Sequence, residues 1–217
     1  HGNGLKTRDI VAMYIKEKLN NKLGEQYAKP QGRITVYQEE PKTERPFDDV
    51  KEGIWYDDAA SYVYENGLMV GIKDKTFGPS EAFSRAMIAQ ILYAMADKPS
   101  VEAASTFKDV PAGKWYTNAV TWCASKGIVS GYPDNTFRPN DNITREQLAV
   151  MLKAYSGDNG NGADISKYAD AAEVSDWAKD AVSWAVGAGL IAGRDGNKLA
   201  PKAYATRAEV AQIMKNF

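Results

Sequence analysis

The sequence is poor in the residues on which most enzymes depend. Its 217 residues include one histidine, His1 at the start of the chain, and one cysteine, Cys123. A histidine-based metal site, a Cys-His pair, a Ser-His-Asp triad and an internal disulfide therefore cannot be assembled from one chain. We expect a protein that is not an enzyme and that has no cofactor and no metal.

An excess of charge of one sign and long apolar runs are also lacking. Lys plus Arg number 27 and Asp plus Glu number 28, so no bulk basic field would attract nucleic acid. The chain has no run of about 18 apolar residues, and its start lacks the charged-then-apolar pattern of a secretion signal. We expect no nucleic-acid binding, no membrane insertion and no export signal within the sequence. The 44% of apolar residues suffice for a globular core.

The main feature that is present is a threefold internal repeat with a period of about 60 residues. In each copy a tryptophan precedes a glycine by 12 residues and an arginine by 30 residues. These anchors are Trp55, Gly67 and Arg85, then Trp115, Gly127 and Arg145, and finally Trp177, Gly189 and Arg207. The spacing predicts repeats at residues 47–98, 107–156 and 168–217, with one residue inserted near Glu173 in the third copy.

Each copy predicts two helices joined by a tight connection. In the second copy, apolar residues at helical steps follow Trp115 until Gly127 ends the helix as a C-terminal glycine. Turn residues then surround residues 136–138, which we expect to be an extended connector rather than a long strand. Neither helix can bury its apolar stripe alone. We therefore expect an all-α fold, in which three helix-loop-helix repeats pack as a pseudo-threefold, three-pronged bundle.

Capping residues predict where the second helices begin. Thr144 and Gln147 have the spacing of a capping box, and Thr206 and Glu209 repeat it. In the first copy Ser84 can cap the helix, but the residue three positions later is a methionine, so we expect a less firmly fixed start.

Residues 1–46 lie outside the repeat. We expect an amphipathic helix over residues 7–23, a strand over residues 33–37 and a charged linker over residues 38–46. This segment could be the tail of an upstream domain.

Taken in order and in triplicate, the repeated motifs resemble the S-layer homology (SLH) domain family. The motifs are an aromatic-x-Asp opening, a tryptophan, a Gly-x-x-x-Gly step, a Phe-x-Pro turn and a helix start similar to Thr-Arg-Ala-Glu. The second copy has them as Phe107, Asp109, Trp115, Gly127, Gly131, Phe137, Pro139 and residues 143–146, and the third copy has Thr206, Arg207, Ala208 and Glu209.

This chain departs from the family pattern in two copies. The first copy has Met87 where the helix-start acid is expected, and the third copy has Tyr168 and Leu199 in place of phenylalanines. We therefore expect that not every one of the three copies need form a functional binding groove.

The resemblance implies a function for residues 47–217. The family anchors bacterial surface proteins to the cell wall, and its grooves bind secondary cell-wall polysaccharide, typically through a pyruvylated sugar. It implies an extracellular location at the bacterial surface. Neighbouring surface-layer proteins are further partners that this setting would offer.

A pyruvylated sugar presents a carboxylate, so a binding site needs a fixed cation, backbone donors and an apolar or aromatic face. Arg85, Arg145 and Arg207 each follow an N-cap, where free backbone N–H groups and the helix dipole favour an anion. Because the dipole disfavours a cation there, either a ligand or an internal acid should compensate each arginine. In the structural alternative, each arginine forms a salt bridge with an aspartate of a neighbouring copy. Those aspartates are Asp49, Asp109 and Asp170.

Two further triplets are candidates for contact with the ligand. The tryptophans could stack on a sugar, although a tryptophan at a helix start is more often a core or cap residue. The glycines that end the Gly-x-x-x-Gly step could allow close approach of a ligand, or could be turn residues with positive φ. These residues are Trp55, Trp115 and Trp177, and Gly71, Gly131 and Gly193. We expect Trp122, Trp184 and Cys123 to lie in the core.

Parts of the sequence suggest three other functions. Asp57 and Asp58 could form a glycosidase-like carboxylate pair, but the second copy has Thr117 and Asn118 at these positions. Residues 158–164 suggest a calcium loop, but two positions that should supply side-chain oxygens are glycines, which favours a flexible linker. The remaining alternative is a protein-protein scaffold module of a surface lattice, without direct glycan binding.

Overall fold

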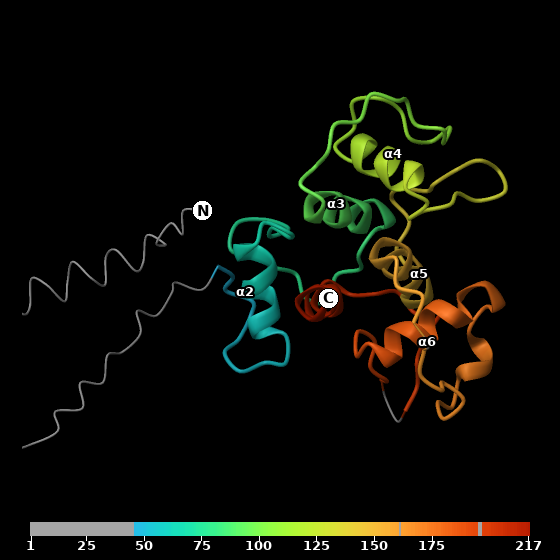
Figure 1. Cartoon of the computed structure of the whole chain (residues 1–217). Coiled ribbons are helices and arrows are strands. Elements are labelled where there is room, and N and C mark those ends of the chain that lie inside the picture. Colours follow the sequence, from blue (N-terminus) through green and yellow to red (C-terminus); the bar gives the residue numbers. More distant parts are fainter. Residues whose placement is uncertain (1–45, 161, 195–196) are drawn as a thin grey trace, which may run out of the picture. The chain divides into compact units, whose positions relative to one another are not determined.

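A computed structural model of the chain describes residues 46–160, 162–194 and 197–217. Within these residues the chain forms six α-helices, two short 3-10 turns and no sheet (Figure 1). The helices are α2 (Asp57–Glu65), α3 (Arg85–Met95), α4 (Thr117–Ser125), α5 (Arg145–Ser156), α6 (Lys179–Gly187) and α7 (Arg207–Asn216), with 3-10 turns at η1 (Ala171–Glu173) and η2 (Asp176–Ala178). The all-α prediction is confirmed. The helix and strand predicted before residue 46 lie outside the described residues.

The first helix of each copy ends at the predicted glycine. In α4, Gly127 has φ of 69°, and the N–H groups of Gly127 and Ile128 donate to the carbonyls of Ala124 and Cys123 at 3.1 and 2.8 Å. These two bonds form a Schellman motif, which satisfies carbonyls that the helix end would otherwise leave unpaired.

The second helices begin at the predicted caps. The Thr144 hydroxyl accepts from the Gln147 N–H at 3.3 Å, and the Gln147 side chain accepts from the Thr144 N–H at 3.2 Å. Thr206 and Glu209 form the same reciprocal box at the start of α7. Ser84 accepts from the Met87 N–H at 3.2 Å, and α3 has no reciprocal bond, as predicted.

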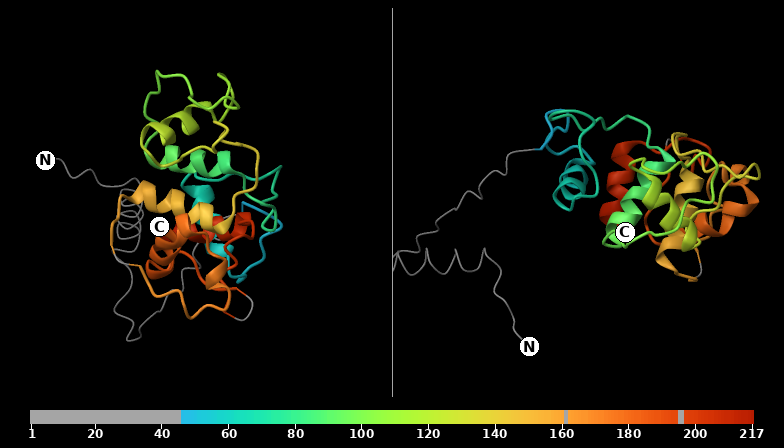
Figure 2. Two further views of the ribbon diagram at one scale, coloured as in Figure 1. Left: turned by 90° about the vertical axis from the view of Figure 1, so that its right-hand side faces the viewer. Right: turned by 90° about the horizontal axis from the view of Figure 1, so that it is seen from above.

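The helices pair between copies rather than within them. The second helix of the first copy, α3, packs on α4 of the second copy, and α5 packs on α6 of the third copy. The third pair, α2 with α7, joins the first copy to the last (Figures 1 and 2). Each pair therefore combines the second helix of one copy with the first helix of the next, and the order closes on itself.

A ring of backbone hydrogen bonds joins the three copies just before α3, α5 and α7. The Ile143 N–H donates to the Phe83 carbonyl at 2.8 Å, the Ala205 N–H to the Ile143 carbonyl at 3.0 Å, and the Phe83 N–H to the Ala205 carbonyl at 3.0 Å. Each residue donates to one neighbour and accepts from the other, so the three segments depend on one another. The pseudo-threefold axis itself stays a prediction.

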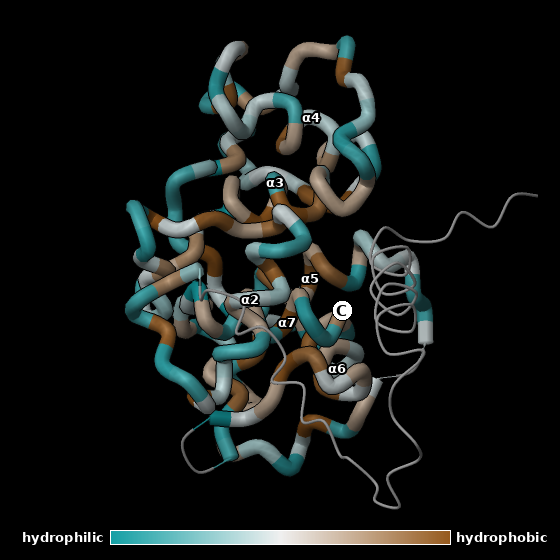
Figure 3. Tube along the Cα trace, turned by 90° about the vertical axis from the view of Figure 1, so that its left-hand side faces the viewer, coloured by the Kyte–Doolittle hydropathy of each residue, from teal (hydrophilic) through white to brown (hydrophobic). Residues whose placement is uncertain are grey.

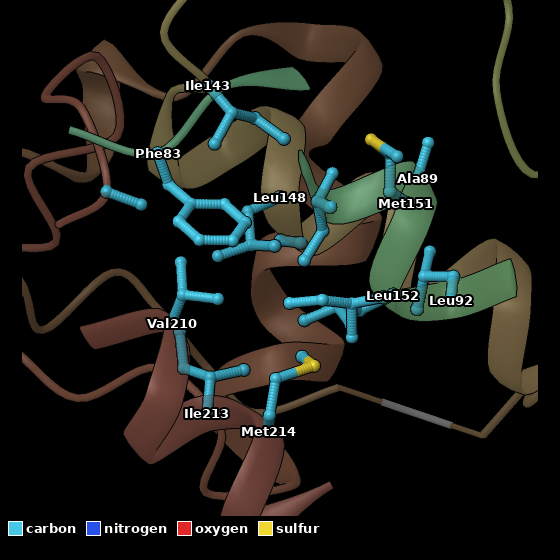
Figure 4. Packing of buried hydrophobic residues seen from close by; sticks show 14 of the residues in the cluster. Phe83, Ala89, Leu92, Ile143, Leu148, Met151, Leu152, Val210, Ile213 and Met214 are labelled. Atoms are coloured by element: carbon cyan, nitrogen blue, oxygen red, sulfur yellow. The ribbon is translucent and has the colours of Figure 1, made fainter. Parts of the chain in front are cut away.

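The core lies where α3, α5 and α7 meet. Side chains from these helices, including Leu92, Leu148, Leu152 and Val210, pack with the ring residue Phe83 and are all buried (Figure 4). Hydrophobic segments recur along the helices, whereas many outer loop segments are hydrophilic (Figure 3). Because this single core contains side chains from all three copies, the packing of each copy depends on the other two.

The residues of the first helices that were predicted to lie in the core differ in how deeply they are buried. Cys123 and Trp184 are buried, as predicted, and burial raises the pKa of the Cys123 thiol to about 12. Trp122 is only partly buried and packs near Tyr93, with ring centroids 5.7 Å apart.

Residues 158–160 and 162–164 are less free than the linker prediction implied. Asp158 accepts from the Trp184 indole N–H at 2.9 Å, and the Ala163 N–H donates to the Ser183 carbonyl at 3.0 Å. Both bonds tie this segment to α6.

None of the described helices is both long enough and apolar enough to cross a lipid bilayer.

Candidate functional site

The three predicted aspartates hold the loop that precedes the second helix of their own copy. Asp109 accepts from the N–H groups of Phe137 and Arg138 at 2.8 and 2.7 Å. The second of these loop residues has positive φ, 59° at Arg138, which turns two consecutive N–H groups toward one carboxylate. The equivalent bonds run from Phe77 and Gly78 to Asp49, and from Leu199 and Ala200 to Asp170.

Each predicted arginine reaches the same loop of the next copy. The Nε of Arg85 donates to the Phe137 carbonyl at 2.8 Å. The equivalent bonds join Arg145 to Leu199 at 2.9 Å and Arg207 to Phe77 at 2.6 Å. Among the described residues no arginine of this set forms a salt bridge with Asp49, Asp109 or Asp170, so the structural alternative is wrong in its direct form. Arginine and aspartate meet through a shared loop residue instead.

The first-turn N–H groups of the second helices are not free for an anion. The N–H of each arginine and of the residue after it donates to loop carbonyls of the next copy. The pairs are Arg85 with Asp141 and Ala86 with Pro139, Arg145 with Ala203 and Glu146 with Pro201, and Arg207 with Glu81 and Ala208 with Pro79. The expectation that helix N-termini bind the ligand is therefore wrong, because protein carbonyls satisfy those donors. The guanidinium groups are the remaining candidates.

The three guanidiniums are buried but differ in their partners. Arg85, Arg145 and Arg207 are 6%, 4% and 5% exposed, and burial lowers the pKa of each, although arginine stays charged at neutral pH. Arg145 donates to the Ala192 carbonyl and to Glu209, each at 2.8 Å. Arg207 donates from Nη2 to the Val70 carbonyl at 2.5 Å.

Arg85 has the least occupied guanidinium of the three. Its Cζ lies 5.1 Å from the Tyr132 ring centroid and 4.6 Å from that of Phe137. Within the described part of the chain its Nη atoms have no hydrogen-bond or ion-pair partner. Every side-chain nitrogen or oxygen that is shut off from solvent in that part does have a partner. Within that part the Nη atoms of Arg85 therefore keep some contact with solvent, although the residue as a whole is only 6% exposed.

Beside this site lies an open groove of about 510 Å³. It is lined by Tyr132, Asn140, Asp141, Asn142, Thr144, Gln147 and Tyr204. Gln147 donates from Nε2 to the Tyr132 hydroxyl at 3.2 Å, and Tyr204 is exposed. Amide, hydroxyl and aromatic groups of this kind suit a sugar. Tyr132, Gln147 and Arg194, which donates from Nε to Glu209 at 2.7 Å, were not predicted as site residues. Tyr132 and Arg194 directly follow Gly131 and Gly193, and Gln147 stands two residues after Arg145, so their positions in the repeat were the available signal.

The tryptophans are on the surface, so the core alternative for them is wrong, and their stacking on a sugar stays a prediction. Trp55, Trp115 and Trp177 are 60%, 58% and 60% exposed. Trp177 lines a pocket of about 450 Å³ together with Lys153 and Asp180. Lys153 lies eight residues after Arg145 in α5, which corresponds to about 12 Å along a helix. In each site the structure therefore places one arginine and one aspartate at the same loop, whereas Trp177 lies away from Arg145.

The glycines that end the Gly-x-x-x-Gly step are needed for an internal contact. Gly71, Gly131 and Gly193 do not have positive φ, so the turn prediction is wrong. A Cβ on Gly131 would lie 2.8 Å from the Thr136 carbonyl and closer still to the Phe107 ring. The aromatic residue that opens each copy fills the space, and contact of these glycines with a ligand stays a prediction.

Comparison with known proteins gives a consistent identification. The S-layer homology domain family matches residues 46–87, 106–149 and 167–211. The chain is 31% identical over 177 residues to an amylopullulanase of Thermoanaerobacterium thermosulfurigenes, 33% over 175 residues to exoglucanase XynX of Acetivibrio thermocellus, and 33% over 159 residues to the surface-layer 125 kDa protein of Lysinibacillus sphaericus.

The matches cover most of this chain and little of each relative. They take in 79%, 77% and 72% of this chain, but only 9%, 16% and 13% of the three relatives in the same order. What these proteins share with the chain is thus one module. Three family matches in tandem and the surface-layer relatives place the module outside the cell, at the bacterial surface and in association with the cell wall, in a non-catalytic anchoring role. The chain belongs to the S-layer homology domain family.

Proposed function

We propose that the chain anchors a bacterial surface protein by binding secondary cell-wall polysaccharide non-covalently, through a pyruvylated sugar held in grooves between repeats. The observation that carries this proposal is the Arg85 guanidinium. It is fixed by the Phe137 carbonyl and by two aromatic rings, and its Nη atoms have no hydrogen-bond or ion-pair partner among the described residues.

A carboxylate is the ligand group that best fits this arrangement. Two Nη donors in one plane can form two parallel hydrogen bonds with a carboxylate, and both bonds are strengthened by charge. The cost of ordering the arginine side chain is met during folding, because Nε is already bound. A ketal carboxylate on the sugar would supply the anion.

The groove beside Arg85 supports the sugar part of the proposal. Its volume of about 510 Å³ is enough for a monosaccharide, and Asn142 and Gln147 offer amide groups to sugar hydroxyls. Tyr132 and Tyr204 offer aromatic faces or edges to the ring. The aspartates act here by holding the loop that positions Arg85, and the glycines act by letting the opening aromatic residue pack beneath that loop.

The exposed tryptophans fit a longer polymer. A polysaccharide extends over many sugars, so units beyond the pyruvylated one could stack on Trp115 or Trp177. Binding of one polymer at several points would raise its apparent affinity without any new kind of contact.

A protein-protein scaffold is the second candidate, and two exposed apolar side chains of the first copy favour it. Val70 and Ile72 are 69% and 49% exposed, and they lie in the same copy as Trp55. Apolar side chains that gather on a surface often mark contacts between proteins.

Calorimetric titration of the 217-residue chain with purified pyruvylated wall polysaccharide separates these two functions. We expect binding to the intact polymer, loss of binding after chemical removal of the ketals, and weakening in Arg85→Gln by about tenfold or more. A folded sample that does not bind the intact polymer contradicts the glycan proposal and favours the scaffold.

A further inference from the structure

The three arginine sites are built on one plan, and one position of the next copy carries a different type of side chain in each of them. The third residue of the following second helix is Glu209 for the Arg145 site and Gln147 for the Arg85 site. In the same cyclic order it is Met87 for the Arg207 site. The plan therefore supplies an acid, an amide and an apolar side chain at equivalent places.

Glu209 binds two arginines at once. Its Oε1 accepts from Nη1 of Arg145 at 2.8 Å and from Nε of Arg194 at 2.7 Å. Its Oε2 pairs with Nη2 of Arg194 and also accepts from the Thr206 N–H at 3.0 Å. Burial acts to raise the pKa of Glu209, but the hydrogen bond from Arg194 and the charge of Arg145 hold that pKa below its ordinary value. The carboxylate is thus ionised and lies between two guanidiniums.

This is the position that a ligand carboxylate would take at a two-arginine site. We propose that Glu209 occupies the Arg145 site as an internal equivalent of the ligand carboxylate, so that the chain binds pyruvylated sugars at Arg85 and Arg207 and not at Arg145. The inference rests on the proposed function and identifies which of its grooves work.

The two open sites are not equal. Arg85 has both Nη atoms without a partner in the described part of the chain, whereas Arg207 already uses Nη2 on the Val70 carbonyl. Asp49 and Glu81 act on Arg207 electrostatically, as Asp109 and Asp141 act on Arg85, but neither arginine forms a salt bridge with a described residue. We therefore expect the Arg85 site to bind more tightly than the Arg207 site.

The repeat itself provides matched variants. Gln147 caps α5 through the same pair of bonds by which Glu209 caps α7, so Glu209→Gln removes the charge and keeps the capping box. Gln147→Glu makes the converse change and places a carboxylate beside Arg85. The first variant should open a site with two arginines, and the second should close one.

The test is calorimetric titration of the 217-residue chain with a methyl pyranoside that carries a 4,6-pyruvyl ketal. We expect Glu209→Gln to raise the stoichiometry from about two sites per chain to about three, and Gln147→Glu to weaken the tighter site by about tenfold or more. Thermal melting checks that each variant is folded. If Glu209→Gln does not fold, the binding affinity of the Gln147→Glu variant at the tighter site becomes the test of the proposal.

A second readout needs no sugar. Phenylglyoxal modifies free guanidinium groups, and peptide mass spectrometry locates the modified arginines. We expect Arg85 to react in the native chain, and Arg145 to react only in Glu209→Gln.

The two proposals fail in distinguishable ways. Three sites in the unaltered chain, or no new site and no new reactivity in Glu209→Gln, overturn the role of Glu209 and leave the proposed function standing. No binding of the pyranoside by the folded, unaltered chain contradicts the proposed function, and with it the sugar-binding part of this inference.

Discussion

Arg85 and Asp109 bind the same residue from its two sides. Asp109 accepts the Phe137 N–H at 2.8 Å, and Arg85 donates to the Phe137 carbonyl at 2.8 Å. The aspartate belongs to the same copy as Phe137, and the arginine to the copy before it. The loop residue therefore couples the fold of one copy to the arginine of another, and the same coupling occurs at Leu199 and Phe77.

Replacing Asp109 should destabilise the fold. Asp109→Asn leaves one acceptor oxygen for two N–H groups, so one loop donor loses its partner, at a cost of about 1–3 kcal/mol in the free energy of unfolding. Urea denaturation measures this loss. Asp134→Asn is the control, because Oδ1 of Asp134 can still accept from Thr136 and its ion pair with Arg138 is exposed. Equal stabilities of the two variants would refute the role of Asp109.

Stability should fall in acid through Asp170 and Glu209. Burial acts to raise the pKa of Asp170, but the N–H groups of Leu199 and Ala200 bring it below its ordinary value, and the pKa of Glu209 is also lowered. A carboxylate with a depressed folded-state pKa adds stability above its unfolded pKa, about 3.9 for Asp and 4.3 for Glu. That stability is lost as the pH falls below those values toward the folded-state pKa.

Chemical denaturation between pH 6 and about pH 2.5 tests this expectation. Asp170→Asn should lower the free energy of unfolding at pH 6 and flatten its decline in acid. A decline in the variant as steep as that of the unaltered chain would show that Asp170 is not responsible.

Part of this arrangement could be predicted from the sequence, because it depends on neighbours along the chain. Gly127 and the pair Thr144 and Gln147 act within one helix end, so spacing alone identifies their roles. The exchange of helices could not be predicted, because each copy offers similar apolar faces and pairing within or between copies buries the same residue types. The exposure of Trp115 could not be decided from the sequence either, because a tryptophan at a helix start fits the core as well as the surface.

Gly131 should not tolerate a side chain. A Cβ there would clash with the Thr136 carbonyl and the Phe107 ring, so Gly131→Ala should lower the free energy of unfolding by about 1–3 kcal/mol. Gly193→Ala is the matched control, since its Cβ would lie 3.1 Å from Cε1 of Tyr168 and 3.5 Å from the Lys198 carbonyl. Thermal melting of both variants gives the comparison, and a smaller loss for Gly131→Ala than for Gly193→Ala would be inconsistent with this packing.

Trp115 should matter for binding more than for stability. The residue is 58% exposed, and its ring meets that of Tyr116 edge-on, with centroids 5.3 Å apart. Trp115→Ala should cost at most about 1 kcal/mol in the free energy of unfolding and should weaken binding to wall polysaccharide about two- to tenfold. The buried Trp184 is the contrast, because Trp184→Ala should cost about 3–5 kcal/mol. A large loss of stability in Trp115→Ala with unchanged binding would assign Trp115 to the fold.

The most direct test of the account is the recognition of a carboxylate at Arg85. The 217-residue chain is titrated with a 4,6-pyruvylated methyl pyranoside and, separately, with the same sugar esterified at its carboxyl group. The account predicts binding of the acid, at least tenfold weaker binding of the neutral ester, and loss of that difference at the tighter site in Arg85→Gln, as expected for about 1.5–3 kcal/mol of charge-assisted hydrogen bonding. Equal binding of acid and ester by the folded chain would contradict it.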